Sequence, residues 1–358
     1  MYFDPRPKKR RKDLYDREKE LEEFEKSLKT SPLTVVTGIR RMGKTSLILV
    51  GLNQRPNIVV DLRGVPQSRE GLYRRIEFAM NEFFKKHREL WQSLKSKLKT
   101  ISGVQVFGSG ISLSWGEKRT DLIELLKSLE GSDVVIAFDE VQQVRGPVGK
   151  EFAEILAHLY DHSDLKLVLS GSEVGLLYDF LGVENPKAPL YGRYFREVKL
   201  ERFDPSKSKD FLTKGFKQVG LDVEEDVIDY ACEKLDGIVG WLVYFGLKCL
   251  ETEPSKDLVE EVLVEAGKLS LEEFMNFARK HSPAESRIFE VARAIASGKR
   301  TWSEIKKHLE GVERKSIPDS SLNRAIRALL NSSFVEKVVE GRNVYYFLTD
   351  PVLAHVLR

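Results

Sequence analysis

Cysteine is scarce in this 358-residue chain, and long apolar runs are missing from it. The two cysteines, Cys232 and Cys249, have no histidine or cysteine neighbour at metal-site spacing, which argues against a zinc site and against a disulfide scaffold. No apolar run approaches the roughly 20 residues that span a bilayer, and the N-terminus lacks the apolar segment of a secretory signal. We therefore expect a cytoplasmic protein with no membrane partner.

The composition is that of a globular protein, with 41% hydrophobic and 32% charged residues, and the length suits two or three domains. The net charge of +3 is unevenly distributed. Residues 1–12 carry six basic side chains and one acidic one, and residues 283–358 carry 13 basic and nine acidic ones, so the stretch between them is acidic. The basic run Lys8–Lys12 is open to two interpretations, a solvated tail or an arm that binds a polyanion.

Short apolar runs alternate with helical patterns over the first 200 residues. This order, with strands that are apolar throughout, predicts a parallel sheet with helices on both faces, which is an α/β fold. A helix is expected over Leu14–Leu28 with Asp16 as its cap, and a long helix over Glu70–Leu98. Alternating residues on both sides of Gly108 predict a β-hairpin. The expected strands of the sheet are 33–37, 58–62, 133–138, 165–169 and 195–200.

The pattern changes twice in the second half of the chain. Residues 205–281 are almost entirely helical in pattern, and from residue 282 three helical stretches precede two β-rich runs joined by Glu340-Gly341-Arg342. That order is typical of a winged helix-turn-helix, and a small helical packing domain with a hairpin has the same pattern. We divide the chain into a basic tail (1–12), an α/β domain (13–204), a helical lid (205–281) and a winged helix (282–358).

One motif carries specific chemistry. Gly38-Ile39-Arg40-Arg41-Met42-Gly43-Lys44-Thr45 matches G-x-x-x-x-G-K-[ST] at every fixed position and lies between an expected strand and an expected helix. In such a P-loop, backbone N–H groups and the helix N-terminus bind phosphate oxygens, Lys44 reaches the β- and γ-phosphates, and the Thr45 hydroxyl faces Mg²⁺. The motif predicts Mg²⁺-ATP binding, with contacts from Gly38, Arg41, Met42, Gly43, Lys44, Thr45 and Ser46.

A second motif supplies acidic groups. The apolar run Val134–Phe138 ends in Asp139-Glu140, which places both carboxyl groups at the carboxyl edge of a parallel sheet. Asp139 is expected to hold Mg²⁺, and Glu140 to activate the water that attacks the γ-phosphate. The alternative for both residues is that they cap a helix. The role of Glu140 has a further alternative, because a nucleotide switch with slow turnover needs only Asp139, the acid that holds the metal.

Two features near the next strands have both a functional and an ordinary explanation. Ser170 and Ser172 end one strand and either sense the γ-phosphate or form a strand-exit turn. Arg193 precedes the following strand and either offsets charge on the transferred phosphate or is a surface arginine.

The order of these motifs resembles the archaeal ATPase family, of the STAND type and related to AAA+ proteins. The resemblance rests on residues 14–21, the P-loop, residues 138–142, residues 170–172 and residues 190–193, and it extends to about residue 250. It implies that Tyr15, Asp16 and Arg17 border the adenine pocket, that Ser172 or Ser170 is a polar sensor, and that Arg193 is a sensor or finger arginine acting on its own site or a neighbour's. Residues 236–242 resemble the glycine-rich lid motif of the family, but Val239-Gly240 replaces the Gly-Pro pair that is common there, and Trp241 is expected to be core.

The winged helix has two candidate roles. In the third helix, Ser321, Arg324 and Arg327 are expected to face away from the buried stripe, toward a DNA major groove, and Arg342 to reach a phosphate from the wing. With only a modest excess of basic residues, a domain that contacts protein or regulates the lid is the alternative.

The sequence therefore predicts a Mg²⁺-dependent ATPase that couples nucleotide state to a winged helix able to bind double-stranded DNA. The first alternative is a signalling switch with little hydrolysis, whose output is association with a second copy or another protein. The second is a P-loop kinase, which an acidic residue placed to activate water disfavours.

Overall fold

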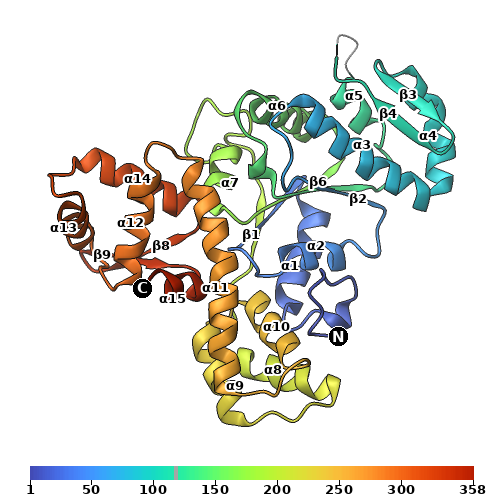
Figure 1. Cartoon of the computed structure of the whole chain (residues 1–358). Helices are drawn as coiled ribbons and strands as arrows, with labels where there is room; N and C mark the ends of the chain where they lie inside the picture. The colour runs from blue at the N-terminus through green and yellow to red at the C-terminus, as the bar shows by residue number, and fades with distance from the viewer. Residues whose placement is uncertain (117–119) are drawn as a thin grey trace.

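A parallel sheet is the centre of the N-terminal half in the computed structural model, which describes residues 1–116 and 120–358 (Figure 1). In the described residues five strands form this sheet in the order β2-β5-β6-β1-β7. The carboxyl ends of β5, β6 and β1 therefore lie side by side, and the expected α/β fold class is confirmed. The strands are β1 (Leu33–Thr37), β2 (Asn57–Asp61), β5 (Val135–Asp139), β6 (Lys166–Gly171) and β7 (Arg196–Lys199).

Both faces of the sheet are buried, which explains why its central strands are mainly apolar. Val35 and Phe138 belong to one hydrophobic cluster, whereas their neighbours Val36 and Ala137 belong to the other. Alternate residues of a strand point to opposite faces, so a strand buried on both sides has no polar face. The flanking helices include α1 (Glu18–Thr30), α2 (Lys44–Gly51), α5 (Leu122–Lys127), α6 (Gly146–His162) and α7 (Val174–Leu181).

Two expected helices differ from the structure. The helix expected over Leu14–Leu28 begins only at Glu18, because Asp16 adopts a left-handed conformation with φ of 47° and does not cap it. The helix expected over Glu70–Leu98 is two helices, α3 (Arg69–Lys86) and α4 (Arg88–Thr100), interrupted at His87. Trp91 packs on Phe84 with ring centroids 4.9 Å apart, which turns α4 back against α3. The expected hairpin is present as β3 (Val104–Phe107) and β4 (Gly110–Leu113).

The C-terminal half is helical up to a small hairpin. One long helix, α11, contributes Val262 and Leu263 to the core of the lid, and Phe274 and Phe277 to the core of the winged helix. The final helix, α15, is absent from the sequence-based expectation, and its Val352 packs into the core of the lid. The elements are α8 (Pro205–Val219), α9 (Glu225–Leu235), α10 (Val239–Lys248), α11 (Lys256–Arg279), α12 (Glu285–Ala296), α13 (Trp302–Glu313), α14 (Asp319–Asn331), β8 (Val335–Glu340), β9 (Asn343–Leu348) and α15 (Pro351–Leu357). Among the described residues, no helix has the length and apolar character needed to cross a membrane.

Part of the expected basic tail is docked on the protein, through Phe3 and Lys8, whereas both interpretations of the basic run stay predictions for its other residues. Phe3 is fully buried in the lid, and a Cβ on Gly215 or Gly246 would lie 2.3 or 2.4 Å from its ring, so only glycine fits beside it. The Lys8 ammonium donates to the carbonyl oxygens of Met1, Tyr2 and Asp4, and its backbone N–H donates to Ser46 at 3.0 Å. Arg6 and the basic residues from Lys9 to Lys12 are exposed.

Phe3→Ala is expected to destabilise the protein by about 3–5 kcal/mol, because it empties a slot that the two glycines cannot fill. The measurement is the shift of the denaturant unfolding midpoint. Tyr194→Ala, which removes an aromatic ring that is 64% exposed, serves as the matched control and should change stability by no more than about 0.5 kcal/mol. Equal midpoints for Phe3→Ala and the wild type would show that the segment does not dock in solution.

Candidate nucleotide-binding site

The phosphate loop joins β1 to α2 and already has an anion-binding shape. Gly38 has φ of 140°, and a Cβ there would lie 2.6 Å from the carbonyl oxygen of Leu200, so the position requires glycine. Gly43 precedes α2 with φ of 89°. The buried Lys44 ammonium donates to the carbonyl oxygens of Gly38 and Ile39 at 2.9 Å each, which holds it under the loop. Burial lowers the pKa of Lys44, and the nearby carboxylates of Glu140 and Asp139 oppose this shift.

The second part of the site lies at the end of β5. The Thr45 hydroxyl donates to Asp139 Oδ2 at 2.7 Å, and the Ser170 hydroxyl at the end of β6 makes a short hydrogen bond to Asp139 Oδ1. Both serve to fix a buried carboxylate beside the phosphate loop. An aspartate oxygen and a threonine hydroxyl are ligands that suit Mg²⁺. The donor set therefore fits a metal held by Thr45 and Asp139.

Glu140 follows in a left-handed conformation with φ of 57°. Its Oε2 accepts hydrogen bonds from the Ser172 hydroxyl at 2.7 Å, the Ser172 N–H at 3.2 Å and Gln142 Nε2 at 2.6 Å. Burial raises the pKa of Glu140, but Lys44 and these donors outweigh it and hold the pKa below the ordinary carboxyl value. Glu140 is thus a carboxylate whose second oxygen, Oε1, is not engaged by these donors.

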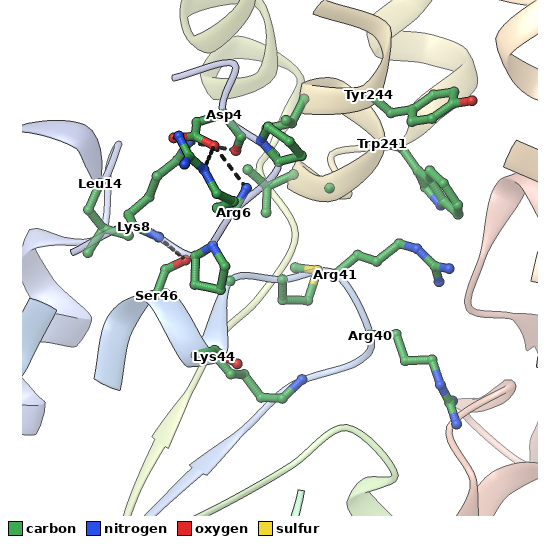
Figure 2. A pocket seen from close by; sticks show the side chains of 18 of the residues that line it. Asp4, Arg6, Lys8, Leu14, Arg40, Arg41, Lys44, Ser46, Trp241 and Tyr244 are labelled. Carbon is green, nitrogen blue, oxygen red and sulfur yellow. Dashed lines mark hydrogen bonds and ion pairs between the residues drawn. The ribbon is translucent and has the colours of Figure 1, made fainter. Parts of the chain in front are cut away.

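A cavity of about 630 Å³ extends from the phosphate loop to the N-terminal segment and α10. Figure 2 shows Lys8 and Ser46 at one end of the cavity, Arg40 and Arg41 at the other, and Lys44 between them. At the end near Ser46 the wall is formed by the segment Asp4–Lys8 together with Leu14, Val243 and Leu247. The volume of the cavity suits a ligand as large as a nucleotide, and both apolar and charged groups line it.

The residues expected at the adenine pocket are only partly placed there. Tyr15 lines the cavity, but its hydroxyl bonds to Asp210 and its ring packs on Phe203 and Phe211. Asp16 does not line the cavity and pairs with Lys207 at 2.8 Å, which corrects its assignment. Arg17 lines it but is buried, with bonds to Glu20 and to the Glu201 carbonyl oxygen at 2.7 Å each. Tyr15 and Asp16 therefore connect the α/β domain to α8 of the lid, and the segment Asp4–Lys8, which sequence reasoning missed, lines the cavity.

Two arginines of the phosphate loop connect it to the C-terminal half. Arg40 pairs with Glu173 at 2.7 Å, donates to the carbonyl oxygen of Ser332 at 3.1 Å, and lies 4.7 Å from the Phe334 ring of the winged helix. Arg41 pairs with Glu273 of α11 and lies 4.1 Å from the Trp241 ring. These contacts were not foreseen, because Arg40 and Arg41 occupy variable positions of the motif and their partners are more than 130 residues away.

The lid motif contacts the loop despite its departure from the usual form. The Gly240 N–H donates to the Arg41 carbonyl oxygen at 2.9 Å. Trp241 is buried as expected of a core residue, and its Nε1 also donates to Asp350 at 3.0 Å.

Arg193 lies away from the phosphate loop of its own chain. It precedes β7, whose first residue Arg196 is in register with Thr34 near the start of β1, whereas the loop leaves the other end of β1. The guanidinium pairs with Asp161 and lies 6.0 Å from the Tyr160 ring. Arg193 does not line the cavity of its own chain, and its role at a phosphate, on its own site or on a second copy's, stays a prediction.

The candidate DNA-binding residues of the winged helix are largely accessible. Arg324, Arg327 and Arg342 are exposed and Ser321 is half-buried. The far end of the same helix, α14, docks on the α/β domain, where Asn331 donates to Asp179 of α7 at 3.0 Å. Arg324 and Arg327 therefore lie on a helix that also contacts the α/β domain, and Arg342 lies in the turn between β8 and β9.

The sheet, the phosphate loop and the Asp139–Glu140 pair together define a P-loop nucleotide-binding fold. Residues 14–245 match the family described as an ATPase domain predominantly from Archaea, and the chain belongs to this archaeal ATPase family. Residues 283–347 match the C-terminal winged helix-turn-helix domain of MCM proteins. The suspected family and the winged helix are both confirmed.

Solved structures agree with this assignment. The Walker-type ATPase PABY2304 of Pyrococcus abyssi is 36% identical, with a TM-score of 0.81 over 100% of both chains. The ORC2 protein of Aeropyrum pernix, solved in ADPNP–ADP complexes, is 15% identical with a TM-score of 0.57, over 96% of this chain and 92% of that one, and shows the shared fold. No protein with curated annotation matches the sequence significantly.

Proposed function

We propose that this protein binds Mg²⁺-ATP and hydrolyses it slowly. The observation that carries the proposal is the conjunction of Lys44, Thr45, Asp139 and Glu140 at one end of a nucleotide-sized cavity. Lys44 and the loop N–H groups would fix the triphosphate. A magnesium ion, held by Thr45 and Asp139, would neutralise phosphate charge. Glu140 would take the proton of the attacking water, and its low pKa keeps it ionised at neutral pH.

Slow turnover is expected from the way Glu140 is held. A carboxylate oxygen that already accepts hydrogen bonds from Ser172 and Gln142 is a weaker base than a free one. Ser172 thus positions the base instead of facing the phosphate.

The nucleotide switch remains the second candidate, and the arginine contacts favour it. Arg40 and Arg41 are phosphate-loop residues whose guanidinium groups are bound to Glu173 and Glu273. A γ-phosphate would compete with these carboxylates and loosen the winged helix or α11. The kinase alternative predicts transfer of label from ATP to a molecule other than water.

Phosphate release from Mg²⁺-ATP, titrated with double-stranded DNA at one low salt concentration, tests the coupling to the winged helix. We expect duplex to change the rate, and the double variant Arg324→Ala/Arg327→Ala to weaken the response at least about fivefold, because each arginine contact to DNA contributes roughly 1–3 kcal/mol. Lys150→Ala, on an exposed face of α6, is the control and should behave as wild type. A rate indifferent to duplex would favour the switch and its protein partners.

A further inference from the structure

We infer that the module formed by α3, α4 and the β3–β4 hairpin binds single-stranded nucleic acid. The module projects from the edge of the sheet at the end of the molecule opposite the winged helix (Figure 1). None of its residues lines the cavity of the proposed nucleotide site, and the proposed ATPase mechanism gives the module no role. The surface is therefore separate from both the nucleotide site and the candidate DNA-binding helix.

Three aromatic side chains are exposed on this module. Phe78 on α3 is 68% exposed, Phe107 on β3 is 58% exposed and Trp115 after β4 is 37% exposed. A partner that covers such exposed rings removes apolar surface from water, and this burial favours binding.

The residues that carry the three rings belong to one packed unit. The Arg74 guanidinium lies 5.2 Å from the Trp115 ring, and Asn81 bonds to both the N–H and the carbonyl oxygen of Ile111 on β4. The Phe107 ring lies beside Gly110, which in turn lies beside Asn81. Phe78 lies between Arg74 and Asn81 in the sequence of α3.

Exposed aromatic rings suit an unpaired strand. In duplex DNA the bases are stacked on each other and are closed to protein side chains. The bases of an unpaired strand are free to stack on aromatic rings of a protein.

The charge of the module points to a polyanion. Residues 69–116 contain nine lysines and arginines and four acidic residues, although the whole chain has a net charge of only +3. On α4, Arg88, Lys95 and Lys99 recur at seven and four residues and so share one helix face. None of these three forms an ion pair with a described residue, so their charge is available to phosphates. A protein partner would need acidic residues opposite these three basic side chains, whereas a nucleic acid carries a negative charge at every phosphate.

A shallow groove beside Trp115 completes the surface. It has a volume of about 310 Å³ and is lined by Gln105, Ser112 and Ser114 as well as Trp115. Gln105 and Ser112 are cross-strand partners on the hairpin. Amide and hydroxyl groups of this kind can bond to the edge of an unpaired base, which a duplex would not expose here.

The test is fluorescence anisotropy of a labelled oligo-dT of about 20 nucleotides, titrated with the full chain at about 50 mM salt and repeated with oligo-U to distinguish DNA from RNA. Phe78→Ala and Phe107→Ala are each expected to weaken binding on the order of tenfold, and Phe107→Trp to retain it. Replacing Lys95 or Lys99 by alanine should lower the slope of log affinity against log salt by about 0.7 for each phosphate that its ammonium neutralises. Unfolding midpoints of the variants confirm that they fold.

Two controls separate this surface from others. Tyr194→Ala removes an exposed aromatic ring elsewhere and should bind as wild type. Lys150→Ala removes an exposed positive charge on α6 and should also bind as wild type, whereas Arg324→Ala/Arg327→Ala tests the alternative that the winged helix holds the oligonucleotide. Absence of binding by the wild type, equal affinities for the wild type and the Phe78 and Phe107 alanine variants, or a decrease confined to the winged-helix variant would overturn the proposal.

Discussion

Lys44→Ala is expected to weaken ATP binding by at least about 100-fold. The ammonium would form charge-assisted hydrogen bonds to two phosphate groups, and each such bond contributes roughly 1.5–3 kcal/mol. In the structure the same ammonium bonds to the carbonyl oxygens of Gly38 and Ile39, so it is already positioned under the loop. Calorimetric titration with Mg²⁺-ATP measures the effect.

A control is needed because the substitution also leaves two loop carbonyl groups without a donor. An unfolding midpoint close to that of the wild type would show that the variant is folded, and Lys150→Ala should bind ATP normally. Unchanged ATP affinity in folded Lys44→Ala would remove this lysine, and with it the phosphate site, from the proposal.

The second large effect concerns Glu140. Glu140→Gln is expected to keep ATP affinity and to lower turnover by about 10²–10⁴-fold, which is the usual contribution of a general base. The amide is nearly isosteric and can keep a hydrogen bond from Ser172, but it cannot take a proton from water. Because the pKa of Glu140 lies below the ordinary carboxyl value, protonation of this group should not reduce wild-type turnover between about pH 8 and pH 6.

Phosphate release and nucleotide binding must be measured on the same preparation. Glu154→Gln, an exposed carboxylate on α6, is the matched control and should turn over at the wild-type rate. Wild-type turnover in Glu140→Gln would exclude Glu140 as the base and would leave the nucleotide switch as the better proposal.

Local signals explain why much of the fold could be predicted. The strands of the sheet are continuous apolar runs because both of their faces are buried, and such runs are visible in a single sequence. The phosphate loop is visible because Gly38 has backbone geometry that only glycine tolerates well. Asp139 and Glu140 stand out because acidic residues directly follow a buried strand.

What could not be predicted depends on partners distant in sequence. Phe3 is one aromatic residue in a charged segment, and its slot is formed by Gly215 and Gly246, more than 200 residues away. Arg193 has the sequence context of a phosphate-binding arginine. The register of β7 against β1, however, places it near the amino ends of these strands, whereas the phosphate loop follows the carboxyl end of β1. The interruption at His87 is equally hidden, because the helical periodicity continues on both sides of it.

The shared helix α11 makes the winged helix inseparable from the rest of the protein. Its last turns, with Phe274 and Phe277, are covered by the C-terminal domain, and Val352 of α15 returns to cover the lid. A chain shortened after residue 281 would expose apolar surface on both elements at once, and such surface promotes aggregation. Deleting the winged helix would therefore remove a binding domain and lower solubility at the same time, so a loss of activity would have two explanations. Point substitutions on the surface of the winged helix change binding alone.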